Sequence, residues 1–289
     1  MSGCQVLGQS VREALKVEGL INYINNVDEL AIETEWIYPN TPTYDTRKII
    51  LYLHGGAHIF LHPGTHRSVT TRLANVCGCR VVAPDYRLCP ENPFPSAIED
   101  ALACYLALIG HTSGIYKSIF EDDEFTGVSP SDVVVMGDSS GACLTLQLVH
   151  ALNRLNLPIP SGIVLISPFL DHEMQGKTWH SNFNHDFLTL DHHGVEWALS
   201  IYANGVPLSH PSLSPVKWLS DLKSMPILVQ AGECDVVLDD AVCFSSSNSG
   251  VRLEVYEDMF HTFHLFPCMS FVEDAFLHIG KFVEQCTEV

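Results

Sequence analysis

The chain has 289 residues, of which 46% are hydrophobic and 17% are charged, and its formal net charge at pH 7 is −19. This composition is typical of a globular protein with a full core, and it excludes a disordered chain. The strong negative charge would repel nucleic acid and anionic membrane surfaces, so we expect neither as a partner.

The chain begins without a basic segment that leads into an apolar one, and no apolar run reaches the length of a membrane span. We therefore expect a cytoplasmic protein with no integral membrane association. Ten cysteines are present, most of them inside predicted helices or strands. In that compartment we expect reduced, mostly buried thiols and not disulfides.

Apolar, β-branched runs alternate with helical patterns along most of the chain. The runs that predict strands are residues 47–53, 80–84, 131–136, 162–167, 225–230 and 251–256. Apolar residues at helical spacing predict helices around residues 98–109, 144–155 and 272–283. This succession is typical of an α/β fold with a mostly parallel sheet flanked by helices.

Residues 169–222 interrupt the alternation, because they contain no strand pattern. An interval this long is seldom a bare loop in a compact domain. We expect a single domain over residues 1–289, with a helical cap formed by about residues 1–30 and 169–222. The alternative is that these segments complete the helical layers.

A pentapeptide, Gly-Asp-Ser-Ser-Gly at residues 137–141, joins an apolar run to a helical one. This is the G-x-S-x-G pattern, in which a sharp strand-to-helix turn lifts a serine hydroxyl to the carboxyl end of a sheet. Small residues on either side relieve the crowding of that turn. The pattern predicts Ser139 as a nucleophile, whereas the simpler interpretation is an ordinary glycine-containing turn.

A nucleophilic serine needs a base, a group that orients the base, and hydrogen-bond donors for the developing oxyanion. Gly55 and Gly56 follow the predicted strand 47–53, where glycines would let backbone N–H groups approach a substrate oxygen. Ser140, the residue after the nucleophile, is expected to donate its backbone amide. The predicted oxyanion hole therefore consists of the amides of Gly55, Gly56 and Ser140.

Candidates for the acid follow the strand 225–230, and candidates for the base follow the strand 251–256. Asp235 lies where catalytic loops emerge, whereas Asp239 and Asp240 resemble the first residues of a helix, where the dipole favours carboxylates. His261 lies nearer to its strand than His264 does. The chain order Ser, Asp, His is that of α/β-hydrolases, so Asp235 and His261 are predicted to complete the triad.

Several segments together resemble the hormone-sensitive-lipase-like family of α/β-hydrolases, the branch with a Gly-Asp-Ser-Ala-Gly elbow. They are the glycine loop 54–57, the Asp-Tyr-Arg-Leu…Pro-Glu…Pro-Phe-Pro segment at 85–95, the elbow at 137–141, and the contexts of Asp235 and His261. The resemblance, over roughly residues 30–285, implies an eight-stranded, mostly parallel sheet with a helical cap. It also implies hydrolysis of carboxylic esters with short to medium acyl chains.

The chain departs from the family pattern at five positions, and four of them lie near the predicted site. Ser140 replaces the usual alanine after the nucleophile, where only the backbone amide is needed, and Asn92 replaces a common histidine. Ala57 stands where the family has a third glycine, and a positive φ would strain it, so Ala57 is left out of the predicted donors. Val236 replaces the usual proline after the acid, and Thr262 replaces the usual glycine after the base. Neither replacement removes a catalytic group.

Four histidines recur every four residues, at His54, His58, His62 and His66. On one helix they would share a face and could ligate a metal ion, but the glycines and the proline between them break any such helix. We therefore predict no metal site and no cofactor.

Two other functions are compatible with the same fold. A receptor could bind a small ligand without turnover, and an amide or formamide hydrolase could use the same triad. The presence of His261 favours an enzyme over a receptor. The expected partner is a small ester substrate, and a homodimer is left open.

Overall fold

The structure is a computed structural model of the chain. It describes residues 32–41, 43–111, 127–187, 192–217, 222, 225–269 and 271–287.

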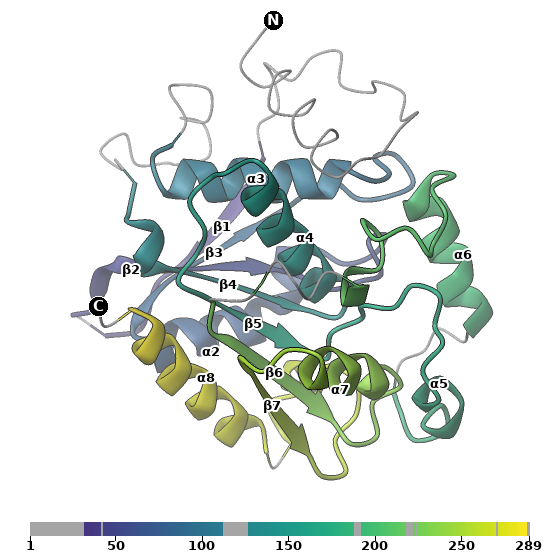
Figure 1. The fold of residues 1–289 in the computed structure, drawn as a ribbon. Helices are drawn as coiled ribbons and strands as arrows, with labels where there is room; N and C mark the ends of the chain where they lie inside the picture. The colour runs from purple at the N-terminus through teal and green to yellow at the C-terminus, as the bar shows by residue number, and fades with distance from the viewer. Residues whose placement is uncertain are drawn as a thin grey trace, which may run out of the picture.

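Seven strands form one twisted sheet, in the order β1-β3-β2-β4-β5-β6-β7 (Figure 1). Their bounds are β1 Thr34–Ile37, β2 Asp45–Leu53, β3 Cys79–Pro84, β4 Val133–Asp138, β5 Gly162–Ile166, β6 Ile227–Gly232 and β7 Val251–Tyr256. Strand β1 pairs antiparallel with β3, and the other pairs are parallel. The six predicted strands are confirmed. The resemblance implied eight strands, and the described part of the chain contains seven.

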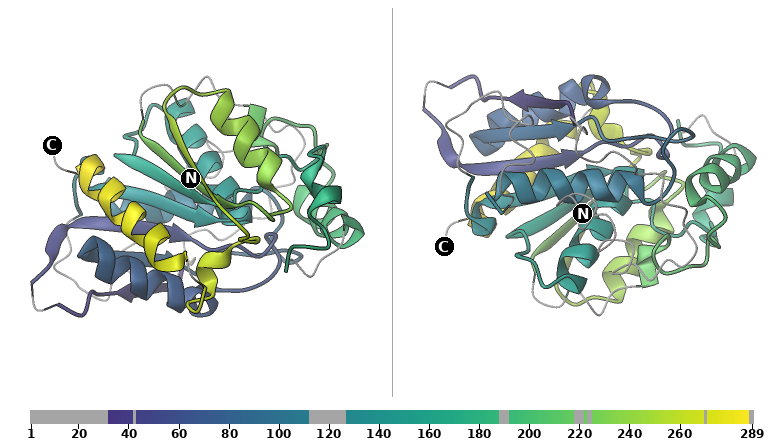
Figure 2. Two further views of the ribbon diagram at one scale, coloured as in Figure 1. Left: turned by 90° about the horizontal axis from the view of Figure 1, so that it is seen from below. Right: turned by 90° about the horizontal axis from the view of Figure 1, so that it is seen from above.

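Helices cover both faces of the sheet, as Figure 2 shows from below and from above. They are α2 Arg67–Cys77, α3 Ser96–Leu108, α4 Ser140–Arg154, α5 Thr178–Ser181, α6 His192–Ala203, α7 Leu238–Ser246 and α8 Val272–Thr287. Short 3₁₀ turns are η2 Pro63–His66, η4 Pro130–Asp132, η5 Pro215–Lys217 and η7 Phe263–Leu265. Helices α3, α4 and α7 pack on one face, and α2 and α8 pack on the other.

Burial on both faces explains why the strands are continuous apolar runs. In β4, Val133 and Val135 point into the core beneath α3 and α4, whereas Val134 and Met136 point into the core beneath α2 and α8. Successive side chains of a strand alternate between faces, so a strand covered on both sides must be apolar throughout. Every residue of β4 is buried.

Helix α2 and strand β1 were not predicted. The α2 sequence contains Val69, Thr70 and Thr71, and β-branched residues are weak helix formers. Its buried residues Val69, Leu73 and Ala74 pack in the core that also contains α8. Tertiary packing therefore outweighs local propensity in this segment.

The described residues between β5 and β6 contain α5, α6 and η5 but no strand. In Figure 1 this segment lies beside one end of the sheet. Residues 1–30, the other part of the expected cap, lie outside the described residues, so the two-part cap stays a prediction.

Within the described part of the chain, no helix combines the length and apolarity that crossing a bilayer requires. The nine cysteines found there are free thiols, and most of them are buried.

The burial of the central strands predicts that truncation of two leucines lowers the free energy of unfolding by very different amounts. Leu165 in β5 is fully buried, whereas Leu277 on α8 is half exposed. We expect Leu165→Ala to lower the free energy of unfolding by about 2–5 kcal/mol, because it removes buried atoms and leaves a cavity. The control Leu277→Ala should change it by less than about 0.5 kcal/mol. Urea unfolding measures both values, and equal losses would contradict the central position of β5.

Candidate active site

Ser139 occupies a sharp turn between β4 and α4, with φ 52° and ψ −121°. This turn brings backbone segments so close that a Cβ at Gly137 would lie 2.3 Å from the carbonyl oxygen of Gly141. The Ser139 amide donates to the Ile166 carbonyl at 2.9 Å, which ties the turn to the end of β5. The predicted strand-turn-helix context of the pentapeptide is therefore confirmed.

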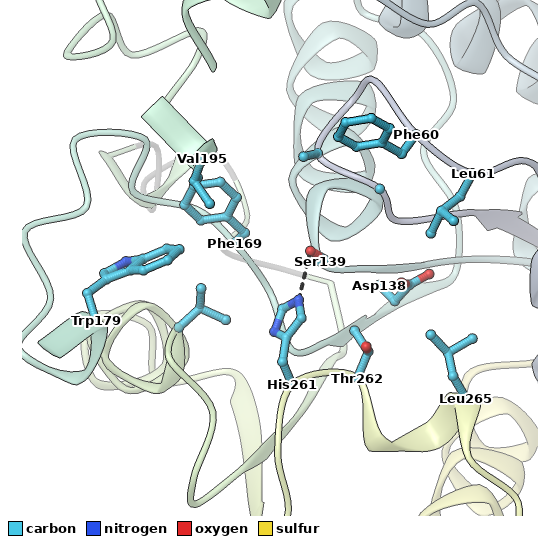
Figure 3. A pocket seen from close by; sticks show the side chains of 13 residues that line it. Phe60, Leu61, Asp138, Ser139, Phe169, Trp179, Val195, His261, Thr262 and Leu265 are labelled. Atoms are coloured by element: carbon cyan, nitrogen blue, oxygen red, sulfur yellow. Dashed lines mark hydrogen bonds between the residues drawn. The ribbon is translucent and has the colours of Figure 1, made fainter. Parts of the chain in front are cut away.

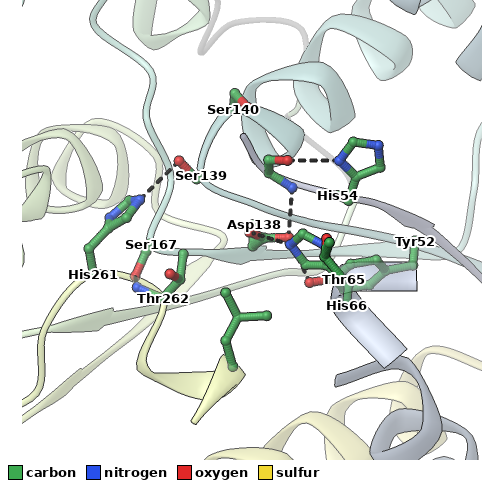
Figure 4. Close-up of polar contacts among 12 residues, drawn as sticks. Tyr52, His54, Thr65, His66, Asp138, Ser139, Ser140, Ser167, His261 and Thr262 are labelled. Carbon is green, nitrogen blue, oxygen red and sulfur yellow. Dashed lines mark hydrogen bonds and ion pairs between the residues drawn. The ribbon is translucent and has the colours of Figure 1, made fainter. Parts of the chain in front are cut away.

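The three residues predicted as a triad form one row of hydrogen bonds. His261 Nε2 lies 2.9 Å from Ser139 Oγ, and His261 Nδ1 lies 2.9 Å from Asp235 Oδ1. The first of these contacts is drawn in Figures 3 and 4. The Val237 amide also donates to Asp235 Oδ1, at 2.9 Å, and so fixes the orientation of the carboxylate. This arrangement can activate a serine hydroxyl for attack on a carbonyl carbon.

The electrostatic environment of His261 suits a base. Burial opposes its charged form, but the Asp235 carboxylate outweighs burial and raises the pKa of His261 above its ordinary value. A carboxylate at this distance stabilises the imidazolium that forms when the histidine accepts a proton. Asp186 adds to the same effect on the pKa of His261.

The other candidates have structural roles. His264 is buried, and its Nε2 lies 2.9 Å from Gln230 Oε1. Burial lowers the pKa of His264 to about 3, so it stays neutral. Asp239 and Asp240 lie in the first turn of α7 as expected, but their carboxylates accept backbone amides of the segment after β5.

Asp138 is the centre of a buried polar network beside the serine (Figure 4). Tyr52 donates its hydroxyl to Asp138 Oδ1 at 2.7 Å, and the Gly55 amide donates to the same atom at 3.0 Å. His66 Nε2 lies 3.4 Å from Asp138 Oδ2. Burial disfavours the Asp138 carboxylate, but His66 and Tyr52 outweigh burial and hold the pKa of Asp138 at about 2.

The prediction that Gly55 donates to the oxyanion is wrong, because its amide is already bound to Asp138. The next two residues of the loop, Gly56 and Ala57, line the cavity in front of Ser139. Ala57 has φ 54°, the positive value that counted against it in the sequence. Gly56 has φ 124°, and a Cβ there would lie 2.0 Å from the Phe60 carbonyl oxygen, so this position requires glycine.

Thr262 also departs from the family pattern in a way that the backbone explains. Its φ is 50°, a left-handed conformation that glycine adopts freely and a β-branched residue adopts rarely. The Thr262 amide donates to Ser167 Oγ at 2.9 Å (Figure 4). This contact holds the residue after His261 in its strained conformation.

A cavity of about 460 Å³ opens in front of Ser139. Figure 3 shows Ser139 and His261 between two apolar groups, with Phe169, Trp179 and Val195 on one side. On the other side are Phe60, Leu61 and Leu265. The full lining consists of Gly56, Ala57, Phe60, Leu61, Asp138, Ser139, Phe169, Trp179, Val195, Val237, His261, Thr262 and Leu265.

Asp186, which the sequence did not suggest, connects the loops that carry the acid and the base. Its Oδ2 accepts the Val236 amide at 2.8 Å, and its Oδ1 accepts the His261 amide at 3.0 Å. Asn182 donates its side-chain amide to the Asp235 carbonyl oxygen at 2.9 Å. No motif surrounds these residues, and their only signal was their place in the long interval 169–222.

Known proteins are similar to this chain in fold and in sequence. A family model described as the alpha/beta hydrolase fold matches residues 50–265. An acetyl-hydrolase of Streptomyces hygroscopicus is 31% identical over 259 residues, which are 88% of this chain and 80% of that protein. An esterase of Acinetobacter venetianus is 31% identical over 225 residues, which are 76% of this chain and 68% of that protein. The crystal structure of an esterase from the bacterial hormone-sensitive lipase family is similar with a TM-score of 0.77 and 28% identity, covering 99% of this chain and 100% of that one.

The parallel sheet with a serine at its strand-to-helix turn defines the class of protein as an α/β-hydrolase. Within that class, the chain belongs to the hormone-sensitive-lipase-like family and is an enzyme of the esterase type.

The contacts of Asp186 predict that its replacement changes the pH dependence of kcat/KM. A histidine that acts as a base must be neutral, so kcat/KM should fall as the pH falls through the pKa of His261, which is raised above its ordinary value. In Asp186→Asn we expect this acid limb to move to lower pH, because a negative charge that raises the pKa is lost. The plateau should fall roughly tenfold, since one hydrogen bond to a charged group is lost.

The distant, exposed Asp274 on α8 provides the control, Asp274→Asn. Its profile should match that of the unmutated protein. Asp186→Glu, which keeps the charge, should keep the acid limb even where its plateau is reduced. An unchanged acid limb in Asp186→Asn would contradict the electrostatic role of Asp186.

Proposed function

We propose that the chain is a serine carboxylesterase that hydrolyses short- to medium-chain esters through a covalent acyl-enzyme. The observation that carries this proposal is the hydrogen-bonded row of Asp235, His261 and Ser139, whose serine faces an apolar cavity. Such a row converts a weakly nucleophilic hydroxyl into a group that attacks carbonyl carbon at neutral pH.

In the first step, Ser139 Oγ attacks the ester carbonyl carbon while His261 Nε2 takes the hydroxyl proton. Asp235 stays ionised and accepts a hydrogen bond from the Nδ1–H of His261, which directs the Nε2 lone pair toward Ser139. The imidazolium then donates its proton to the leaving alcohol oxygen, and the acyl group stays on Ser139. In the second step His261 deprotonates a water molecule, which attacks the acyl carbonyl carbon. The bond between this carbon and Ser139 Oγ then breaks, the imidazolium returns the proton to Oγ, and the acid is released.

The oxyanion of each tetrahedral intermediate needs donors placed before the reaction begins. We assign this role to the backbone amides of Gly56, Ala57 and Ser140. Gly56 and Ala57 line the cavity beside Ser139. Ser140 is the first residue of α4, and an amide in the first turn of a helix has no acceptor within the helix.

The volume of the cavity and the net charge of the chain favour small, neutral esters. A volume of about 460 Å³ lies toward the lower end of the range for small-molecule sites, about 300–1,000 Å³. The apolar groups on both sides of Ser139 suit the acyl and alcohol arms of an ester. The net charge of −19 disfavours anionic substrates. We propose that residues 169–222 form the cap over this cavity, because Phe169, Trp179 and Val195 belong to its lining.

Two adjacent serines provide a direct test of the nucleophile. We expect Ser139→Ala to lower kcat for p-nitrophenyl butyrate by at least about 10⁴-fold, because no nucleophile remains. Ser140→Ala should retain most of the activity, because the proposed role of Ser140 uses its backbone amide. Steady-state kinetics measures both variants, and wild-type turnover by Ser139→Ala would refute the proposal. Mass spectrometry should locate a covalent organophosphate adduct on Ser139 in the unmutated protein.

The lining of the cavity predicts an acyl-chain preference. Across p-nitrophenyl esters of increasing acyl length, kcat/KM should be greatest for short to medium chains and then fall. Trp179→Ala should shift this maximum toward longer chains, because it enlarges the cavity. Phe183→Ala is the control, since Phe183 is an exposed aromatic outside the lining. If Trp179→Ala had the same chain-length profile as the unmutated protein, the proposed role of Trp179 in limiting the acyl chain would be contradicted.

Formamide and amide substrates in the same assay separate an esterase from an amide hydrolase that uses the same triad. Tight binding of a small ligand without turnover would instead indicate a receptor. The cytoplasmic location and the homodimer stay predictions from the sequence, and light scattering tests the second.

A further inference from the structure

Three buried side chains with metal-ligating atoms converge behind the active-site cavity. They are His58, Cys143 and His172, and their ligand atoms all lie within 4.8 Å of one another. Each side chain comes from a different segment. His58 follows the glycine loop, Cys143 lies in the first turn of α4, and His172 lies in the segment after β5.

Both imidazoles lack hydrogen-bond partners among the described residues. Neither ring nitrogen of His58 and neither ring nitrogen of His172 has one, although the two residues are only 1% and 0% exposed. Buried polar atoms are nearly always paired, because leaving them unpaired costs free energy. Two buried imidazoles without partners in one cluster therefore point to a further group that binds there, and each ring offers it one nitrogen lone pair.

The ligand types of the cluster suit a soft metal cation. A coordinated metal ion displaces the proton of a cysteine thiol outright, so Cys143 would bind it as a thiolate. Two imidazoles and one thiolate bind Zn²⁺ and Cu⁺ more tightly than they bind the hard cations Mg²⁺ and Ca²⁺.

The backbone at His58 is strained in a way that such a ligand would offset. His58 has φ 61° and follows Ala57 at φ 54°, so two consecutive non-glycine residues are left-handed. Strain of this kind persists where surrounding contacts hold it, and it clusters at ligand sites. The His58 ring also stacks on Tyr202, with 3.8 Å between ring centroids, which fixes its direction.

We propose that His58, Cys143 and His172 form a structural binding site for a thiophilic d¹⁰ metal ion, Zn²⁺ or Cu⁺. The ion would join the glycine loop, the start of α4 and the segment after β5. Ala57 and Phe169, which line the cavity, lie one and three residues from two of these ligands. The four-residue histidine series does not form this site; of its members only His58 takes part.

Metal analysis of the full chain, expressed without a histidine tag in medium containing zinc and copper, tests this site. We expect about one metal ion per chain in the unmutated protein, and its identity distinguishes Zn²⁺ from Cu⁺. Cys143→Ala should reduce the content to less than about a tenth of that value. Cys104→Ala is the matched control, because Cys104 is an equally buried cysteine outside the cluster. Its metal content should be unchanged.

A second measurement keeps the test valid where Cys143→Ala fails to fold. Co²⁺ added to chelator-treated, unmutated protein under reducing conditions should give a thiolate-to-cobalt charge-transfer band. The thermal midpoint should rise when Zn²⁺ or Cu⁺ is restored. Absence of copurified metal together with absence of the cobalt band would overturn the proposal. Equal metal loss in Cys104→Ala and Cys143→Ala would also overturn it.

Discussion

The turn at Ser139 is the constraint on which the rest of the structure depends. A non-glycine residue at φ 52° and ψ −121° is strained by about 1–3 kcal/mol, and it persists only where its surroundings hold it. Strands β4 and β5 supply that support, because the Ser139 amide bonds to the end of β5 and every residue of β4 is buried. The strain keeps the hydroxyl at the edge of the sheet, where His261 reaches it.

Asp138, the neighbour of that serine, links the turn to the glycine loop. Its carboxylate is buried, so it requires the hydrogen bonds of Tyr52 and Gly55 and the nearby His66. By binding the Gly55 amide, Asp138 fixes the loop and leaves the following residues to face the cavity. Asp138, the second residue of the Gly-Asp-Ser-Ser-Gly pentapeptide, thus positions the glycine loop.

The segment between β5 and β6 has two connected roles. Trp179 and Val195 line the cavity, while Asn182 and Asp186 bind the backbone of the acid and base loops. Any shift of this segment would therefore change both the shape of the cavity and the alignment of His261 with Ser139. Substrate recognition and catalytic geometry are mechanically coupled in such an arrangement.

The α/β fold, the turn at Ser139 and the order of Ser139, Asp235 and His261 could all be predicted from the sequence. These features depend on local patterns, namely strand and helix periodicity and the small residues that a sharp turn requires. The direction of the Gly55 amide, the bridging position of Asp186 and the convergence of His58 with two distant residues could be seen only in the folded chain. Each of these depends on contacts between segments far apart in the chain, and no local spacing specifies where such side chains point. Helix α2 could not be predicted either, because its residues have weak helix propensity. Its packing in the core shared with α8 stabilises it.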